Sequence, residues 1–170
     1  MSQVSSEFIP ANIAILTVTD RRTEAEDTSG QYLQEAAEQA GHQVVTRALV
    51  KDNIYQIRAL VSVWIASDEV QVVLINGGTG FTGGDHTPEA LLPLFDRQVE
   101  GFGELFRTLS FEEIGTAAIQ SRALAGMANQ TVIFAMPGST RACRTAWQRI
   151  IAEQLDARHR PCNFLPHLKK

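Results

Sequence analysis

The chain has 170 residues, of which 44% are hydrophobic, and carries a formal net charge of −4 at pH 7. This length predicts a single domain spanning residues 1–170, and an acidic chain does not offer the broad basic face that nucleic-acid binding requires. Its apolar runs are shorter than the ~20 residues that span a bilayer, and its N-terminus lacks the basic segment of a signal peptide, so we expect a cytoplasmic protein that binds neither membrane nor nucleic acid.

The first 50 residues predict two strands with a helix between them. Residues 12–18 form a short, β-branched apolar run, which is typical of a buried strand. The sequence Asp-Thr-Ser-Gly at 27–30 supplies side chains that can accept hydrogen bonds from free amides at the start of a helix, here the segment 31–40. The alternating apolar residues of 42–50 predict the second strand.

The middle of the chain repeats this alternation. Apolar residues at helical spacing predict a helix over 54–67. Residues 70–75 predict a third strand, whose uninterrupted apolar residues are typical of a parallel sheet covered on both faces. Because proline can open a helix but not continue one, Pro88 predicts the start of a helix over 88–95 that a second proline shortens. A further helical segment is expected at 101–113.

The last third of the chain predicts two more strands, at 123–127 and 131–136, and an amphipathic closing helix over 139–155. The ends of the domain, 1–10 and 157–170, are expected to be extended tails. Basic residues are concentrated after residue 140. They could bind a small anion, contact an acidic neighbour or simply face solvent.

Strand and helix alternate at least four times along the chain, which predicts an α/β fold. We expect a three-layer αβα arrangement, with a mostly parallel sheet and helices on both faces. In such sheets, ligands bind outside the carboxyl ends of the strands. The loops after 12–18, 70–75 and 131–136 should therefore share one edge, and each carries residues suited to binding phosphate.

The segment 76–90, NGGTGFTGGDHTPEA, is rich in glycine and follows the third strand. It contains a formal GxGxxG match. However, the dinucleotide-binding motif runs straight from a strand into a helix, and a Walker A loop needs a Lys-Ser/Thr pair that this segment lacks. Glycine accepts positive φ and lets a phosphate approach the main chain, so we interpret the segment as a nest of N–H groups for an anion. The hydroxyls of Thr79 and Thr82 would add donors.

Two aspartates are candidate metal ligands. Asp85 follows the glycines, where a carboxylate would repel a phosphate unless a cation lay between them. Mg²⁺ binds one or two carboxylates together with substrate phosphates, and Asp52, after the second strand, could share that ion from the same edge. Each aspartate could instead only cap the helix that follows it. His86, beside Asp85, is expected to face solvent.

The loop after 131–136 contains Pro137, Gly138, Ser139 and Thr140 directly before a helix. Free amides and a partial positive charge at a helix start suit an anion such as a phosphate. An ordinary capped helix has the same sequence pattern, so both interpretations remain open.

Four blocks of the sequence together resemble the molybdenum-cofactor proteins of the MoaB/MogA type, a family that includes the gephyrin G domain. They are GGTG (77–80), DHTPEA (85–90), GFGE (101–104) and MPGSTRA (136–142). The resemblance extends in matching order over about residues 10–155. The stretches LTVTDRR and DTSG, and the tail containing CNF, look like the bacterial MoaB branch.

The resemblance implies a molybdopterin-binding fold, assembled as a homo-trimer or homo-hexamer, that binds molybdopterin together with Mg²⁺ and ATP or GTP. Active members of the family transfer AMP from ATP to molybdopterin. The alternative is a pterin- or nucleotide-binding homologue with little or no transfer, which acts as a carrier or as an assembly partner of other cofactor-synthesis proteins.

The resemblance places catalysis and the Mg²⁺ ion at Asp52 and Asp85. The positions expected to contact substrate or nucleotide are Asp20, Ser29, Gly30, Asn76, Gly77, Gly78, Thr79, Gly80, Thr87, Pro137, Gly138, Ser139 and Thr140. The chain departs from the family pattern at Asn76, where threonine is common, and at Ser139-Thr140, where Asn-Pro is common. Both departures fall on the expected ligand loops and favour binding without efficient transfer.

Overall fold

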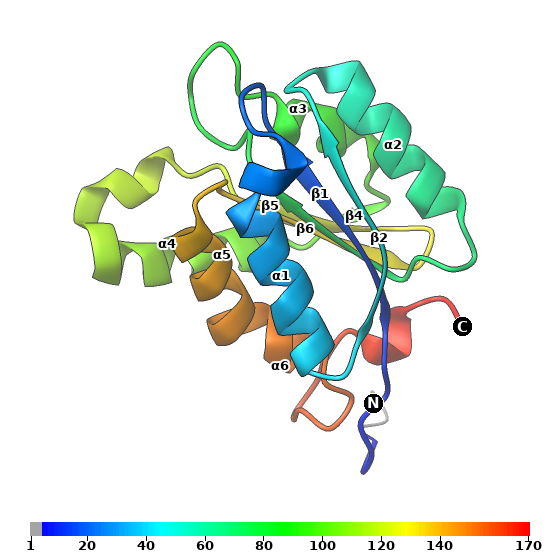
Figure 1. The fold of residues 1–170 in the computed structure, drawn as a ribbon. Coiled ribbons are helices and arrows are strands. Elements are labelled where there is room, and N and C mark those ends of the chain that lie inside the picture. Colours follow the sequence, from blue (N-terminus) through cyan, green and yellow to red (C-terminus); the bar gives the residue numbers. More distant parts are fainter. Residues whose placement is uncertain (1–4) are drawn as a thin grey trace.

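The computed structural model, which describes residues 5–170, contains one six-stranded sheet between two layers of helices (Figure 1). The strands are β1 (Asn12–Val18), β2 (Gln43–Val50), β3 (Val72–Asn76), β4 (Arg97–Gln98), β5 (Leu124–Ala128) and β6 (Thr131–Met136). They lie in the order β2-β1-β3-β6-β5-β4. The first four in that order are parallel, whereas β5 is antiparallel to both of its neighbours. The predicted mostly parallel α/β sheet is confirmed, and the short edge strand β4 is an addition that the sequence did not predict.

The helices follow the predicted segments, with two local differences. They are α1 (Thr28–Gln39), α2 (Ile54–Ala66), α3 (Thr87–Leu91), α4 (Glu100–Ile114), α5 (Thr140–Ala146) and α6 (Ala152–Gln154). A π-helical segment, Trp147–Ile151, joins α5 to α6, so the closing helix is continuous but not regular. The helix expected over 88–95 is shorter, because Pro93 cannot supply an α-helical hydrogen bond and Leu92–Leu94 form a 3-10 turn instead.

Successive residues of the central strands point to opposite faces, and each face is covered by its own helices (Figure 1). In β1, Ile13 and Ile15 pack with residues of α1, α4 and α5. Ala14 and Leu16 pack with residues of α2 and α3 on the other face. All four are fully buried, and burying an Ile or Leu side chain stabilises the fold by about 1.5–3 kcal/mol. Burial on both faces explains why these strands contain few polar residues.

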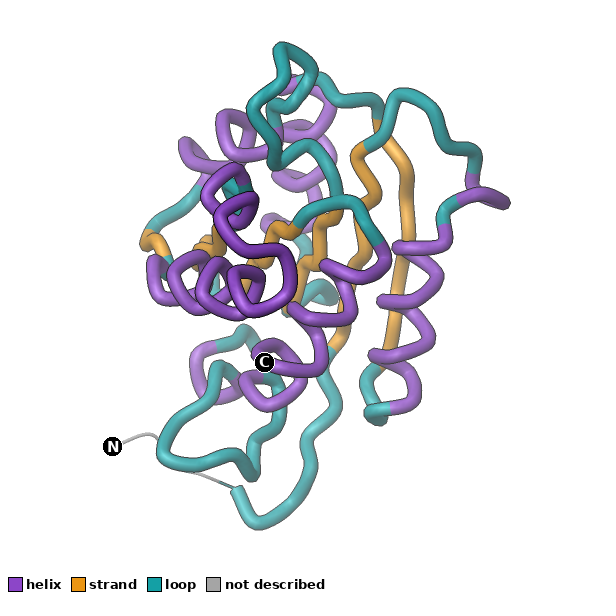
Figure 2. Tube along the Cα trace, turned by 90° about the vertical axis from the view of Figure 1, so that its left-hand side faces the viewer, coloured by secondary structure: helices purple, strands orange, loops and turns teal. Residues whose placement is uncertain are grey.

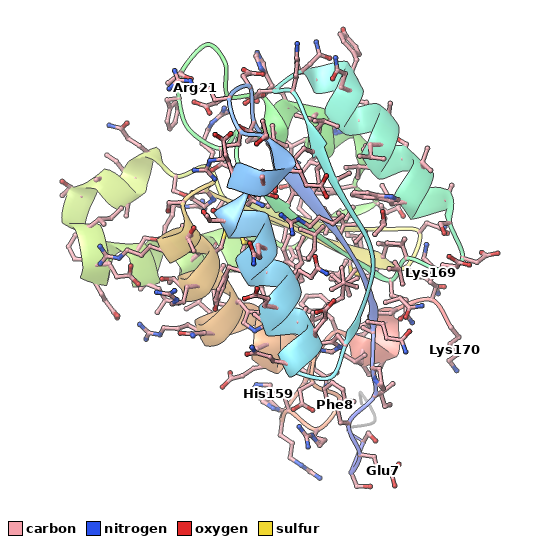
Figure 3. The ribbon with its side chains drawn as sticks, in the orientation of Figure 1. Glu7, Phe8, Arg21, His159, Lys169 and Lys170 are labelled. Atoms are coloured by element: carbon pink, nitrogen blue, oxygen red, sulfur yellow. The ribbon has the colours of Figure 1, made fainter. Side chains whose placement is uncertain are left out.

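The carboxyl ends of β1, β2, β3 and β6 lie at one edge of the sheet because these strands are parallel. Figure 1 shows the loops after β1 and β3 projecting from the same end of the molecule, and the loops gather at that end in Figure 2 as well. Arg21, in the loop after β1, lies at this end, whereas Phe8 and His159 lie at the opposite one (Figure 3).

The C-terminal segment, expected to be an extended tail, packs against the domain. It contains a 3-10 turn at Leu165–His167, and Leu168 is buried. Lys169 Nζ donates hydrogen bonds to the carbonyls of Ile65 (2.9 Å) and Ser67 (2.6 Å) at the end of α2. Because these carbonyls have no partner within the helix, the lysine caps α2 from a distant part of the chain.

Within residues 5–170, no helix is both long enough and apolar enough to cross a membrane.

Candidate functional site

The glycine loop after β3 contacts the loop after β6 directly. The amide of Gly77 donates to the carbonyl of Met136 (3.0 Å). A Cβ atom added at Gly138 would lie 3.3 Å from Gly77 Cα. Since this is closer than most Cβ contacts in proteins, the two loops approach each other through their glycines, and the predicted meeting of these loops is confirmed.

The start of α1 contacts the β6 loop through hydroxyl groups. Ser29 Oγ donates to the carbonyl of Gly138 (2.7 Å) and lies 3.1 Å from Thr140 Oγ1. Thr140 Oγ1 also lies 3.1 Å from Thr28 Oγ1. Ser139 has a different partner, because its side chain accepts a main-chain hydrogen bond and caps α5. The third predicted loop, after β1, therefore reaches the same edge through the helix that follows it.

Arg22 lies on this contact between α1 and the β6 loop. Its Nη1 atom is 3.2 Å from the carbonyl oxygen of Gly138 and 3.4 Å from Ser29 Oγ. A guanidinium carries five N–H donors, so Arg22 keeps donors free for an anion beside this turn. Sequence reasoning missed this residue, because only the path of the loop brings it to a partner 116 positions away.

Asp52 connects the β2 loop to its neighbours. Its amide donates to Asp20 Oδ1 (3.0 Å). Its own Oδ1 accepts the amide of His86 (2.9 Å) and lies 3.1 Å from His86 Nδ1. The residue that caps α2 is Asn53, whose side chain accepts two amide hydrogen bonds. Asp52 is thus free of the capping role. The His86 ring, expected to face solvent, keeps a 34% exposed side chain but also contacts Asp52.

Asp85 closes the glycine loop. Its Oδ2 accepts hydrogen bonds from the amide (2.9 Å) and the hydroxyl (2.6 Å) of Thr82. The N-terminal cap of α3 is His86, and no side chain makes a capping hydrogen bond there. The alternative that Asp85 only caps this helix is therefore wrong.

Two glycines of the loop leave room for the carboxylates. A Cβ atom at Gly78 would lie 2.8 Å from Asp52 Oδ2, and one at Gly80 would lie 2.7 Å from Asp85 Oδ2. Both distances are shorter than real Cβ contacts, and Gly78 also has a positive φ of 70°. Alanine at either position would push a carboxylate away from the loop.

The expected ligand contacts fall into two groups. Those with solvent access are Asp20, Asp52, Gly78, Gly80, Asp85, Pro137, Gly138, Ser139 and Thr140. Those that are buried are Ser29, Gly30, Asn76, Gly77, Thr79 and Thr87. The residues of the second group are buried, so they lie beneath the loop surface, and their contact with a ligand stays a prediction. Thr87, for example, donates its hydroxyl hydrogen bond to the carbonyl of Gly77 (2.7 Å).

A buried hydrogen-bond network explains the position of Asn76. Its Nδ2 donates to Thr17 Oγ1 (2.9 Å), and Thr17 Oγ1 donates to Asp27 Oδ2 (2.8 Å). Because a carboxylate only accepts, the hydroxyl proton goes to Asp27 and the amide orientation of Asn76 follows. Asp27 also binds Arg47 (3.0 Å) and accepts the amide of Gly30 (2.9 Å). This amide is therefore not available to a ligand.

The two carboxylates of the site have opposite pKa shifts. Burial raises the pKa of Asp52; hydrogen bonds from His86 offset this only in part, and the charge of Asp85 reinforces it. Burial also acts to raise the pKa of Asp85, but the hydrogen bonds from Thr82 and Gly80 and the charge of Arg122 leave that pKa below its ordinary value. Two carboxylates within electrostatic reach of each other favour a cation at this site.

The residues present fit a magnesium ion shared with a ligand. The hydrogen bonds from His86 are made to Asp52 Oδ1, which leaves Asp52 Oδ2 available, and both hydrogen bonds from Thr82 are made to Asp85 Oδ2. No group of three or more His, Cys, Asp or Glu side chains in the part of the chain described could hold a metal. Mg²⁺ does not need such a group, since it completes its shell with water and substrate phosphates.

Comparison with known proteins gives matches over most of the chain. Residues 14–157 match the family model of a probable molybdopterin binding domain. The chain is 74% identical over 170 residues to molybdenum cofactor biosynthesis protein B of Escherichia coli (strain K12), with both chains covered completely. It is 45% identical over 142 residues to the protein of that name from Bacillus cereus, which covers 83% of this chain and 84% of the relative.

Solved structures agree with the sequence matches. A crystal structure of molybdenum cofactor biosynthesis protein B superimposes with a TM-score of 0.84 at 43% identity, covering 86% of this chain and 92% of that one. The tungsten cofactor synthesizing protein MoaB from Pyrococcus furiosus superimposes with a TM-score of 0.75 at 34% identity, covering 85% and 92%. The chain therefore belongs to the MoaB/MogA family of molybdenum cofactor biosynthesis proteins and has its molybdopterin-binding fold.

Proposed function

We propose that the protein acts in molybdenum cofactor biosynthesis by transferring AMP from ATP to molybdopterin at the loop edge of the sheet. The names of its relatives support the pathway. The observation that carries the proposed transfer is the meeting of two carboxylates from separate loops, Asp52 and Asp85, with the glycine loop. A glycine loop that only turned the chain would not need two carboxylates held against its main chain.

The proposed reaction is one of positioning and charge screening. An oxygen of the molybdopterin phosphate forms a bond to the α-phosphorus of ATP, and the bond to the β-phosphate breaks to release pyrophosphate. The attacking phosphate is already ionised at neutral pH, so the main obstacle is repulsion between anions. Mg²⁺ bound by Asp52 and Asp85 would supply charge screening. Main-chain N–H groups of the glycine loop can bind nucleotide phosphates beside it.

The pterin phosphate is proposed to bind at the turn that contains Gly138 and Thr140. This turn faces the start of α1, and Arg22 lies beside it. A guanidinium suits phosphate because its planar donors match two oxygens at once. The two anions would then lie on neighbouring loops, since the loops meet at Gly77 and Gly138.

A second candidate function is binding of pterin or nucleotide without efficient transfer, as a carrier or as a partner of other cofactor-synthesis proteins. The observation in its favour is that the hydroxyls of Ser139 and Thr140 already have partners within the protein. A hydroxyl that caps α5, as Ser139 does, or that joins α5 to α1, as Thr140 does, contributes less to a ligand. Asn76 does not discriminate, because it is fully buried.

One assay separates the two functions. The purified protein is incubated with molybdopterin, Mg²⁺ and either ATP or GTP, and pyrophosphate and nucleotidylated pterin are measured. The transfer proposal expects both products, and expects Asp85→Asn to slow their formation by roughly 10²–10³, the usual cost of removing one preorganised electrostatic group.

Glu69→Gln is the matched control, because this exposed carboxylate precedes β3 and lies at the other end of that strand. It should leave turnover unchanged. Tight binding of pterin without either product would reject the transfer and support the second function.

A further inference from the structure

Arg122 holds both ends of the glycine-rich segment 80–85. Its side chain crosses from the residues before β5 to a loop 42 positions earlier, where Nε donates to the carbonyl of Gly80 (2.7 Å). Nη2 donates to the carbonyl of Asp85 (2.9 Å). The main-chain amide of Arg122 also donates to the carbonyl of Thr79 (2.9 Å).

The guanidinium is itself oriented by two neighbours. Its Nη1 atom forms an ion pair with Glu89 on α3. Its central carbon lies 5.2 Å from the centre of the Phe81 ring, and Phe81 is 67% exposed. The planar guanidinium is therefore contacted at its edge by Glu89 and on its face by Phe81, which restricts its movement away from the loop. A lone arginine after a helical segment carries no sequence signal for this arrangement.

The middle of the segment has few other restraints. A Cβ atom added at Gly83 would have no neighbour within 4 Å apart from the adjoining residues. One added at Gly84 would have Thr82 Oγ1 as its nearest neighbour, 3.9 Å away. Without support, peptide groups between glycines rotate easily, because glycine populates both signs of φ. The internal hydrogen bonds from Thr82 to Asp85 restrain only the turn itself.

The carbonyl contacts have an electrostatic consequence. Carbonyl oxygens repel phosphate, whereas main-chain N–H groups attract it. The carbonyl oxygens of Gly80 and Asp85 accept hydrogen bonds from the guanidinium of Arg122, so they point at this side chain and not at a bound phosphate. The same two hydrogen bonds restrain the main chain of Asp85, and the position of the main chain determines where the carboxylate can lie.

We propose that Arg122 is a positioning residue, which holds the segment 80–85 in the conformation that receives the phosphates of the nucleotide. This inference rests on the proposed function of the loop. It assigns the residue to the support of the site and not to contact with the reacting atoms. Its planar fork binds two carbonyls at once, which a single ammonium group cannot do in the same geometry.

The first test needs no substrate. Hydrogen exchange of the amides in 80–85 is compared in the wild type, Arg122→Gln and Arg122→Lys. Both variants are expected to exchange faster there, by roughly tenfold or more, because each loses charge-assisted hydrogen bonds. Arg107→Gln is the matched control: Arg107 Nη1 donates to the carbonyls of Ser121 (3.2 Å) and Ala123 (2.9 Å), on either side of Arg122, and not to the loop.

The second test uses Mg²⁺-pyrophosphate as a probe, measured by titration calorimetry. Arg122→Gln and Arg122→Lys are expected to bind it roughly tenfold more weakly, while Arg107→Gln binds as the wild type does. In the transfer assay, the same variants should raise KM for ATP more than they lower kcat. If the wild type proves inactive in transfer, the exchange and pyrophosphate results still decide the role of Arg122.

Three outcomes would overturn the proposal. One is unchanged exchange and unchanged pyrophosphate affinity in Arg122→Gln. Another is full rescue by Arg122→Lys, which would assign the effect to charge alone. The third is an equal effect of Arg107→Gln, which would show that any loss of order in the residues before β5 raises exchange in the loop and weakens pyrophosphate binding. If Arg122→Gln does not fold, Glu89→Gln tests the same point, because it removes the partner that orients the guanidinium.

Discussion

Asp52 accepts a hydrogen bond from the main-chain amide of His86 at 2.9 Å, and this contact joins the loop after β2 to the glycine loop after β3. The His86 ring lies on the same carboxylate oxygen, 3.1 Å away through Nδ1. Since an ionised carboxylate only accepts, Nδ1 carries the proton in this arrangement. One oxygen of Asp52 thus joins the two loops, and the other is the one that we propose to bind Mg²⁺.

This arrangement predicts that Asp52→Asn loses turnover without losing stability. Asparagine Oδ1 can still accept the His86 amide, but its NH₂ group cannot bind Mg²⁺. Burial raises the pKa of Asp52, so its contribution to stability is present below the unfolded pKa and lost as pH rises through the folded value. At neutral pH the ionised side chain therefore costs stability, and the variant should melt at an equal or higher temperature.

Pyrophosphate release and thermal melting are the two measurements for Asp52→Asn. Release is expected to slow by roughly 10²–10³. A variant that melts well below the wild type would show that the carboxylate is needed for the fold itself, and the assignment to the metal site would then be wrong.

Arg22→Ala is predicted to weaken molybdopterin binding and leave nucleotide binding unchanged. Its guanidinium lies beside Gly138 and Ser29, next to the proposed pterin turn, and makes no hydrogen bond to Asp52 or Asp85. Loss of a charge-assisted contact to phosphate should raise the Kd for molybdopterin by roughly tenfold or more. Arg21→Ala is the control, because Arg21 is the exposed neighbour in the same loop (Figure 3). Equal losses in both variants would indicate general charge attraction in place of a specific contact.

The meeting of the loops could be predicted from the sequence, because it depends only on strand direction. The runs that became β1, β3 and β6 are short, apolar and separated by helices, and parallel strands bring their carboxyl ends together. The glycines and hydroxyl residues of these loops then indicated that they bind phosphate. Register, side-chain direction and long-range partners were not needed for that step.

The choice between adjacent polar residues could not be made in the same way. Asp52 and Asn53 both suit the cap of α2, and the structure uses Asn53 because Asp52 is held by Asp20 and His86. Those partners lie more than 30 positions away. Local patterns carry no information about contacts of this length.

The burial of residues beneath the glycine loop could not be predicted from the sequence either. Asn76 ends an apolar strand, where a polar residue suggests a ligand contact, yet it is fully buried with its amide directed at Thr17. What holds it is the chain of hydrogen bonds through Asp27 to Arg47 on β2. A polar network across neighbouring strands appears only once the strand order is known.

Oligomer formation through the outer face of α4 is a further expectation, since the family resemblance implies a trimer or hexamer. Large apolar side chains are exposed on α4 and on the turn that follows: Leu105 (46%), Phe111 (59%), Ile114 (50%) and Ile119 (75%). Light scattering should give a trimer or a hexamer for the wild type and a lower mass for the Phe111→Asp, Ile114→Asp double variant. Tyr55→Asp, at a 73% exposed position on α2, should not change the mass. A monomeric wild type would contradict the expectation.

His42 is predicted to make stability depend on pH in the acidic range. It is 5% exposed, packs against the rings of Phe8 and Trp147, and accepts the amide of Ala11 through Nδ1 (3.0 Å). This hydrogen bond requires the neutral ring. Burial lowers the pKa of His42 below its ordinary value of 6.5, and the charge of Asp156 opposes this only in part.

The sign of the effect follows from where the proton binds first. As pH falls through about 6.5, the unfolded chain takes up a proton at this position before the folded chain does, so the unfolded state gains relative stability. The contribution of neutral His42 is present above that pH and is lost as pH falls through the folded pKa. Each unit by which the pKa is lowered corresponds to about 1.4 kcal/mol.

Urea unfolding between about pH 7.5 and 5 measures this contribution directly. His42→Asn is the informative variant, because its Oδ1 can accept the Ala11 amide as Nδ1 does but cannot titrate in this range. The wild type should lose more unfolding free energy on acidification than the variant, by an amount set by the pKa shift. Parallel curves for the two proteins would mean that His42 does not titrate differently in the folded and unfolded chains, and the burial argument would then be wrong.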